Sequence, residues 1–271
     1  MLKQRIITAA ILLPLALCGF FLLSGLSFAL FIGLVVTLGA WEWARLAGYE
    51  AQTVRLGYAA LVALALVLLY HVPLLAPWVM AVSLLWWLAA ILLVFGYPGS
   101  QRFWGGKGGS LIIGLLVLLP AWQGLLLLKQ WSDAGWLILA VMLLVWVADI
   151  GAYFSGKALG RRKLAPAVSP GKSWEGLLGG LLASLLLSLV VLIYCGWPTA
   201  RVLAALLVAA IVVLISVVGD LTESMFKRSA GIKDSSQLLP GHGGVMDRID
   251  SLTAAVPVFV VLYWLLERSA W

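Results

Sequence analysis

Charged residues are scarce in this chain. They make up 11% of its 271 residues, whereas hydrophobic residues make up 63%, and the mean hydropathy is +1.09. So apolar a composition excludes an ordinary soluble domain. It indicates a protein that is buried in a membrane over most of its length.

Cysteine and histidine are also rare, with two of each. Cys18 and Cys195 lie inside apolar runs, so we expect small buried hydrophobic residues and not a disulfide or a metal site. Two histidines are too few to indicate a zinc centre. A Walker-type phosphate loop is missing as well, because the Gly-Lys-Ser run at 171–173 has Pro166 where the pattern requires its first glycine.

Long apolar runs are what the chain has instead. Runs of about 20 apolar residues can cross a bilayer as helices, and their continuity favours helices over a β-barrel. The sequence therefore predicts an all-α polytopic membrane protein with about nine transmembrane helices. Eight or ten stay open, because the third run is short and a bare turn separates the first two. The nine runs are 6–24, 26–44, 56–71, 74–96, 109–129, 134–156, 176–195, 201–220 and 251–267.

Basic residues are distributed unevenly between the connecting loops. If the loops alternate from a cytoplasmic N-terminus, 15 of the 18 lysines and arginines lie inside. Such an excess is typical of cytoplasmic loops, so loops 157–175 and 221–250 are expected to face the cytoplasm. We interpret 1–271 as a single membrane domain in which 1–100 is scaffold and 140–271 is the catalytic core.

A carboxylate interrupts the sixth apolar run. Placing Asp149 inside a membrane helix costs roughly 2.5–3.5 kcal/mol, which indicates a cavity or a partner. Tyr153, Gly156 and Lys157 follow on the same helical face. This predicts a polar stripe that leads to the cytoplasmic end, with neutralisation by a neighbouring helix as the alternative.

Segment 156–176 gathers five cations, several glycines and Pro170-Gly171, which we expect to form its turn. Glycine lets backbone amides approach an anion, and lysine or arginine neutralises it. The segment is therefore a candidate polyphosphate site, with Lys172 and Ser173 as candidate contacts.

Nine of the 29 charged residues lie between Asp220 and Asp250. Asp220, Glu223, Ser224 and Lys227 have the spacing of one helical face. Pairing of Glu223 with Lys227 is the purely structural alternative, although it leaves Asp220 unexplained.

The turn at 240–244 displays His242, and Asp247 and Asp250 follow on one face near the positive end of the last helix. Carboxylates without thiolate ligands suit a hard cation such as Mg²⁺, completed by phosphate and water. The residues alone thus predict an anion-handling, metal-using membrane enzyme.

The segment from Ser224 to Asp250 resembles the signature of the phosphatidate cytidylyltransferases, also called CDP-diacylglycerol synthases. Asp149 and the segment 169–176 are similar to that family more loosely. The matching signature residues are Ser224, Phe226, Lys227, Arg228, Lys233, Asp234, Ser236, Leu239, Pro240, His242, Gly243, Gly244, Val245, Asp247, Arg248, Ile249 and Asp250.

The resemblance implies that CTP and phosphatidate give CDP-diacylglycerol and pyrophosphate, with Mg²⁺ as cofactor. It further implies phospholipid synthesis by a homodimer in the bacterial inner membrane, surrounded by membrane lipid and without nucleic acid as a partner. A second, monovalent cation such as K⁺ stays open.

Roles follow as hypotheses. The catalytic candidates are Asp220, Lys227, Arg228, His242, Asp247 and Asp250, of which Asp220, Asp247 and Asp250 are assigned to Mg²⁺. The candidates for substrate binding are Asp149, Lys172, Ser173, Ser224, Lys233 and Arg248. Lys227 and Arg228 would hold the triphosphate, and His242 either donates to the leaving pyrophosphate or fixes its loop.

Three other classes remain as alternatives. An ion-coupled transporter would use Asp149 and Asp220 as a relay, but charge gathers at one membrane face, and the two halves lack paired broken helices. A CDP-alcohol phosphatidyltransferase needs a D-G-x-x-A-R run that this chain does not have. A dolichol-kinase-like enzyme would share the nucleotide but phosphorylate an alcohol.

Overall fold

The computed structural model describes residues 2–268, which are mostly helical. The apolar runs form helices because a helix satisfies its backbone N–H and C=O groups internally, as a bilayer requires. The long helices are α1 (Leu2–Leu22), α2 (Gly25–Leu46), α3 (Gln52–His71), α4 (Ala76–Phe95), α6 (Lys107–Leu128), α7 (Ala134–Leu159), α8 (Trp174–Tyr194), α9 (Thr199–Ser229) and α10 (Met246–Arg268). The shorter elements are η1 (Pro73–Leu75), α5 (Gln101–Trp104), β1 (Lys163–Ala165) and β2 (Ser169–Ser173).

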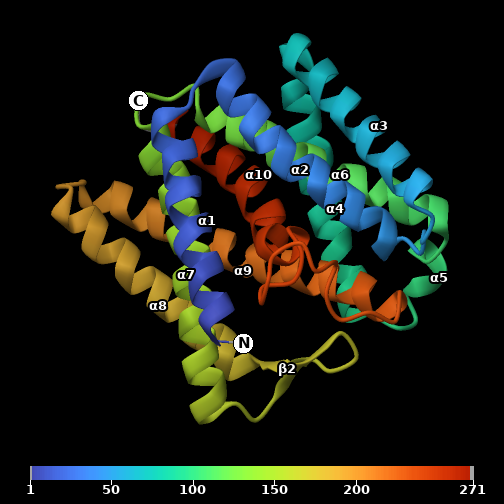
Figure 1. The fold of residues 1–271 in the computed structure, drawn as a ribbon. Helices are drawn as coiled ribbons and strands as arrows, with labels where there is room; N and C mark the ends of the chain where they lie inside the picture. Colours follow the sequence, from blue (N-terminus) through green and yellow to red (C-terminus); the bar gives the residue numbers. More distant parts are fainter. Residues whose placement is uncertain (1, 269–271) are drawn as a thin grey trace.

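Eight helices within residues 2–268 are long and apolar enough to cross a membrane, and α1 contributes a shorter apolar stretch, Ile6–Leu22. The two ends of α1 have different neighbours. Thr8 Oγ1 donates to the carbonyl of Pro240 in the loop after α9 (2.9 Å), and Lys129 Nζ beyond α6 donates to the carbonyl of Phe20. The prediction of an all-α polytopic membrane protein is confirmed, and α1 runs lengthwise along the bundle (Figure 1).

Helix α10 lies in the middle of the bundle (Figure 1), packed against α2, α4, α6, α7 and α9. Residues 251–260 are all buried, since other helices cover α10 on several sides. Helix α8 lies at the edge, and its exposed leucines Leu178, Leu182 and Leu186 recur every four residues. This stripe is apolar surface that lipid can cover.

Small residues bring α7 and α8 into close contact. A Cβ atom on Gly180 would collide with the backbone carbonyl of Ala148, and one on Gly151 would lie 2.9 Å from the Cβ of Ala183. Glycine and alanine allow this backbone approach between membrane helices. The contact fixes the helix that carries Asp149 against the helix that follows the hairpin.

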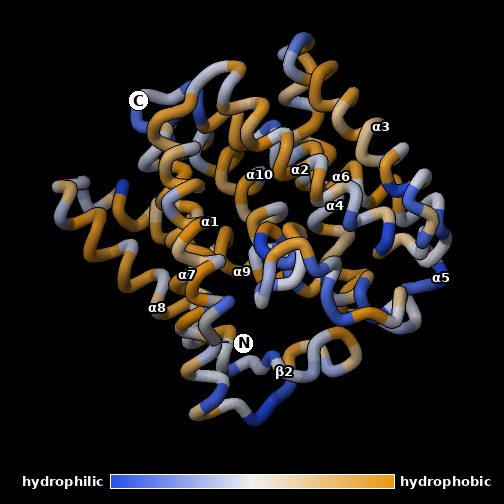
Figure 2. Tube along the Cα trace, viewed as in Figure 1, coloured by the Kyte–Doolittle hydropathy of each residue, from blue (hydrophilic) through white to orange (hydrophobic). Residues whose placement is uncertain are grey.

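Hydrophilic residues gather around β2 and in the loop between α9 and α10, whereas the helices are mainly hydrophobic (Figure 2). Strands β1 and β2 pair antiparallel and form a small hairpin in an otherwise helical protein. The chain reverses at 166–168, where the N–H of Val168 donates to the carbonyl of Ala165 over 3.1 Å. The turn predicted at Pro170-Gly171 is therefore wrong, because these residues lie within β2.

Two further expectations need correction. The segment predicted as loop 221–250 is helical at both ends, because α9 continues to Ser229 and α10 begins at Met246, so the loop itself covers only 230–245. Cys18 and Cys195 are free, as expected, but exposed and not buried. An apolar residue in a membrane helix can face lipid as readily as the interior, so hydropathy alone does not predict burial here.

Candidate active site

Asp220 of α9 is paired with a cation from the hairpin. Lys172 Nζ on β2 lies 2.7 Å from Asp220 Oδ2, and Ser224 Oγ donates to Asp220 Oδ1 over 3.2 Å. Both side chains of the ion pair are 28% exposed, so an incoming phosphate can reach them. The pair joins the two charged segments of the sequence at one place.

Lys227 bridges two carboxylates. Its Nζ lies 2.5 Å from Glu223 Oε2 and 2.8 Å from Asp247 Oδ1 of α10. The three side chains are largely closed to solvent, with exposed fractions of 13% for Lys227, 1% for Glu223 and 7% for Asp247. The pairing of Glu223 with Lys227 considered from the sequence is thus present, and the same ammonium group also connects α9 to α10.

Backbone groups hold the other side of Asp247. Its Oδ2 accepts the N–H of Gly244 (2.7 Å), the N–H of Ser235 (3.0 Å) and the hydroxyl of Ser235 (3.0 Å). Gly243 is required in this turn, since its φ is +82° and a Cβ there would lie 2.5 Å from Asp247 Oδ2. The glycine turn expected from the sequence thus wraps the Asp247 carboxylate.

Asp250 lies where α9 and α10 touch. A Cβ on Gly219 would come within 2.6 Å of the carbonyl oxygen of Asp250, so the two backbones are in contact beside Asp220. The N–H of Ser251 donates to Asp250 Oδ1 over 2.8 Å. Acidic residues from separate helices therefore meet at one end of the bundle.

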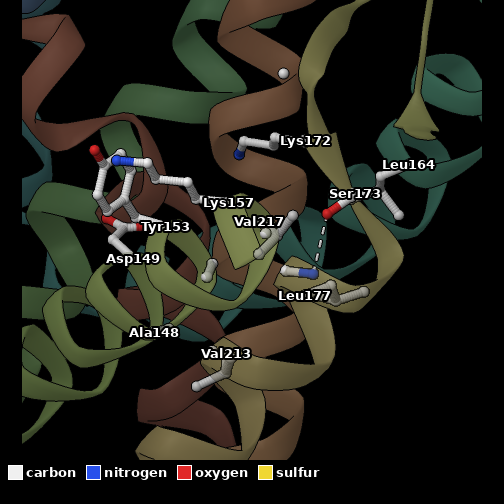
Figure 3. A pocket seen from close by; sticks show the side chains of 15 residues that line it. Ala148, Asp149, Tyr153, Lys157, Leu164, Lys172, Ser173, Leu177, Val213 and Val217 are labelled. Carbon is white, nitrogen blue, oxygen red and sulfur yellow. Dashed lines mark hydrogen bonds between the residues drawn. The ribbon is translucent and has the colours of Figure 1, made fainter. Parts of the chain in front are cut away.

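A pocket of about 360 Å³ opens beside this cluster (Figure 3), and we call it the polar pocket because charged and hydroxyl side chains line part of its otherwise apolar wall. Apolar side chains of α8 and α9 complete its wall, and the hydroxyl of Ser173 also accepts the N–H of Gly176 (3.1 Å) and so caps α8. The predicted polar stripe of α7 is confirmed as part of the lining. The polar side chains that line the pocket are Asp149, Tyr153, Lys157, Lys172 and Ser173.

The other predicted cations surround the loop after α9. Arg228 Nε donates to the carbonyl of Val168 over 3.1 Å and joins the end of α9 to the hairpin. Arg248 is exposed, and its Nε donates to the carbonyl of His242 over 3.0 Å. Lys233 is exposed in the loop, whereas His242 Nδ1 is buried with no hydrogen-bond partner in the part of the chain that is described.

Two acidic residues that were not predicted as site residues organise this region. Glu42 near the end of α2 is fully buried and accepts hydrogen bonds from Ser235 in the loop after α9 and from Met246 at the start of α10. Glu175 in the first turn of α8 accepts the backbone N–H groups of Arg161 (3.0 Å) and Arg162 (3.2 Å). Glu42 interrupts an apolar run just as Asp149 does, so the same rule applied to α2 would have identified it.

The carboxylates fit a hard cation in type, although they form no ready cage. Among residues 2–268, no group of three or more His, Cys, Asp or Glu side chains is arranged to hold a metal ion. Mg²⁺ is usually held by one or two carboxylates together with water and substrate phosphates. Glu223 Oε1 is buried and has no hydrogen-bond partner in the same range. This carboxylate oxygen is therefore able to bind a cation.

Comparison with known proteins gives matches over nearly the full length of the chain. A model described as "Cytidylyltransferase family" matches residues 3–266. The phosphatidate cytidylyltransferase of Pseudomonas aeruginosa is 68% identical over 264 residues, which cover 97% of each chain. That of Haemophilus influenzae is 43% identical over 289 residues, covering 97% of this chain and 99% of its own. The chain therefore belongs to the cytidylyltransferase family.

Proposed function

We propose that this chain transfers CMP from CTP to phosphatidate, giving CDP-diacylglycerol and pyrophosphate in phospholipid biosynthesis. The observation that carries the proposal is the pair of lysine–carboxylate contacts beside the polar pocket, Lys172 with Asp220 and Lys227 with Asp247. They concentrate anion-binding groups at one end of a membrane bundle. Full-length likeness to two phosphatidate cytidylyltransferases supports the identity of the substrates.

The chemistry needs no side-chain nucleophile, because the phosphate monoester of phosphatidate is already an oxygen nucleophile at neutral pH. One of its oxygens attacks the α-phosphorus of CTP. A new phosphorus–oxygen bond forms there as the bond to the bridging oxygen of pyrophosphate breaks. The protein's task is to align the two phosphate groups and to neutralise their charge.

Lys172, Lys227 and Arg228 are the groups best placed to hold the triphosphate. Each lysine now faces carboxylates, and a phosphate would share or replace those contacts as a charge-assisted acceptor. The remaining candidates lie around the same pocket and loop, where they can orient the substrates: Asp149, Ser173, Ser224, Lys233, His242 and Arg248.

Mg²⁺ would be held by Asp220, Asp247 and Asp250, with water and phosphate completing its shell. When bound, the ion neutralises charge on the reacting phosphates. For Asp247 this role requires Lys227 to release the oxygen that it now contacts. A second, monovalent cation such as K⁺ is a further candidate cofactor.

An apolar pocket of about 540 Å³, lined by α4, α8, α9 and α10, provides a place for the acyl chains of phosphatidate. Leu164, Leu177 and Val217 line both this pocket and the polar one. A diacyl lipid must keep its phosphate at the polar end and its chains in apolar surroundings. The shared lining places the two pockets side by side, so we propose that the phosphate lies at the polar pocket and an acyl chain in the apolar one.

The inner membrane, with the site facing the cytoplasm, is the location we propose. Fifteen of the 18 basic residues fall on that side when the loops alternate, in line with the positive-inside rule. CTP is also available on that side. The family likeness leads us to expect a homodimer.

Purified protein with phosphatidate and CTP labelled on either the α- or the γ-phosphate tests the proposal. We expect the α-label in lipid and the γ-label in pyrophosphate, and both transfers to require Mg²⁺. Transfer of the γ-label to lipid would indicate a CTP-dependent kinase instead. Ion movement in proteoliposomes without any labelled lipid would refute the proposal in favour of a transporter.

A further inference from the structure

Glu42 is a buried carboxylate surrounded by hydrogen-bond donors. It is 0% exposed and accepts four hydrogen bonds, three from the loop after α9 and one from the first residue of α10. A buried carboxylate without such partners would be strongly unfavourable. The donors are Ser235 Oγ (3.0 Å), Ser236 Oγ (2.5 Å), Val245 N–H (2.9 Å) and Met246 N–H (2.7 Å).

The arrangement requires a carboxylate at position 42. Each oxygen accepts from one serine hydroxyl and one backbone N–H, with Ser236 and Val245 at Oε1, and Ser235 and Met246 at Oε2. A glutamine at this position would direct its NH₂ group toward a backbone N–H in either orientation of the amide, so two donors would face each other. The negative charge also lies at the positive start of α10.

Surrounding contacts fix the end of α2 against the loop and against α9. A Cβ on Gly244 would lie 2.5 Å from Glu42 Oε1, so the loop passes directly over the carboxylate. Trp43 is fully buried and packs on Phe226 of α9, with 4.9 Å between ring centroids. Arg45 Nη1 donates to the carbonyl of Ser235 over 3.2 Å. Glu42 is therefore held rigidly beside the segment that it binds.

Ser235 connects Glu42 to the site. Its hydroxyl oxygen lies 3.0 Å from Glu42 Oε2 and 3.0 Å from Asp247 Oδ2, so one hydroxyl proton lies between two carboxylates. Asp247 in turn contacts Lys227 over 2.8 Å. The orientation of Lys227 thus depends on Asp247, which Ser235 holds, and Ser235 depends on Glu42.

We propose that Glu42 is a positioning residue for the transfer reaction. It holds the segment 235–246 in place and so orients Asp247 and Lys227, without touching either substrate. The inference rests on the proposed function for the roles of Asp247 and Lys227, whereas the attachment of the segment to α2 is independent of that function.

The test compares Glu42→Gln with Glu50→Gln, the same substitution at an exposed position in the loop after α2. Amide hydrogen exchange over 233–247 and CMP transfer are measured on both variants. We expect Glu42→Gln to speed exchange in this segment and to lower kcat/KM about 10- to 100-fold, the range for losing one buried acceptor. Glu50→Gln should change neither.

A double-variant cycle with Ser235→Ala separates positioning from a general loss of stability. If Glu42 acts through Ser235, the double variant should transfer CMP little more slowly than Glu42→Gln alone. Fully additive losses would overturn the proposal, as would wild-type turnover or unchanged loop exchange in Glu42→Gln.

If Glu42→Gln does not fold, Glu42→Asp retains the charge on a shorter side chain. Faster loop exchange together with reduced transfer in that variant supports the proposal, and wild-type values for both refute it. If the wild-type chain transfers no CMP, the proposed function fails, but the exchange data still decide whether Glu42 holds the segment.

Discussion

Lys227→Met tests whether the ammonium group between α9 and α10 has a structural role, a functional role or both. The substitution leaves Glu223 and Asp247, which are 1% and 7% exposed, without their shared cation. Removing one partner of a buried ion pair costs roughly 3–5 kcal/mol. We therefore expect a clearly lower melting temperature in detergent and loss of CMP transfer.

Adding Glu223→Gln to Lys227→Met separates the two roles. The amide removes one of the two stranded charges, so part of the lost stability should return. Transfer should stay low, because position 227 no longer carries an ammonium group to hold a phosphate. Full recovery of transfer in the double variant would show that Lys227 acts only by neutralising Glu223.

Arg201→Met is the matched control at another ion pair. Arg201 Nη2 lies 2.6 Å from Glu267 Oε1 between the start of α9 and the end of α10, with the side chains 35% and 36% exposed. This pair is much more exposed than the Lys227 contacts, and well-exposed pairs contribute about 0–1 kcal/mol, so melting should change much less than in Lys227→Met and transfer not at all. Thermal melts followed by size-exclusion chromatography, together with labelled CTP, give both readouts. A wild-type melting temperature and turnover in Lys227→Met would refute the reasoning.

The carboxylates, the apolar pocket and the metal requirement can each be perturbed alone. Asp220→Asn should reduce turnover about 10²- to 10³-fold, as for other groups that stabilise transition-state charge, with the detergent-stable size unchanged; normal turnover would remove Asp220 from the site. Leu214→Trp narrows the apolar pocket and should raise KM for long-chain more than for short-chain phosphatidate, whereas an equal effect on both would argue against acyl chains there. Removing divalent ions with EDTA should abolish transfer but leave the melting temperature nearly unchanged. The reason is that residues 2–268 alone form no three-ligand metal cluster. A large fall in the melting temperature would contradict this prediction.

The membrane helices follow from the sequence because an apolar run of about 20 residues has one way to satisfy its backbone in a bilayer. Helix ends do not follow as well. Helix α9 continues past the predicted end at 220 to Ser229, and α3 begins at Gln52 and not at 56. Hydropathy marks where apolar surroundings end, whereas helical hydrogen bonding continues through charged residues.

Local spacing predicted which residues share a helical face, but not which turn closes the hairpin. Both Pro166 and Pro170 are compatible with a turn. The hydrogen bond from Val168 to Ala165 places Pro166 second in the turn, a position that proline favours. Pairing of Lys163 with Ser173 then places Pro170 inside a strand, and this long-range pairing is not visible in local sequence.

Contacts between distant segments were the least predictable part of the site. Glu42 lies 193 residues from Ser235 in the chain, and Val168 lies 60 residues from Arg228. No local pattern joins such pairs, because each depends on how whole helices pack. The sequence therefore predicted the charged groups of the site but not the groups that orient them.

Two lysines of the site are already paired with carboxylates before any substrate is present. Lys172 and Lys227 already face carboxylates, so a phosphate gains only the difference between its own contact and the one that it replaces. The pairing stabilises the cationic side chains at the end of an apolar bundle, where an unpaired buried charge would be costly. The orientation of the lysine side chains therefore matters as much as their charge. A phosphate can compete with a carboxylate for an ammonium group only where that group points toward the bound substrate. Glu42 on α2, which holds the loop after α9, thus contributes to the site as much as the cations do.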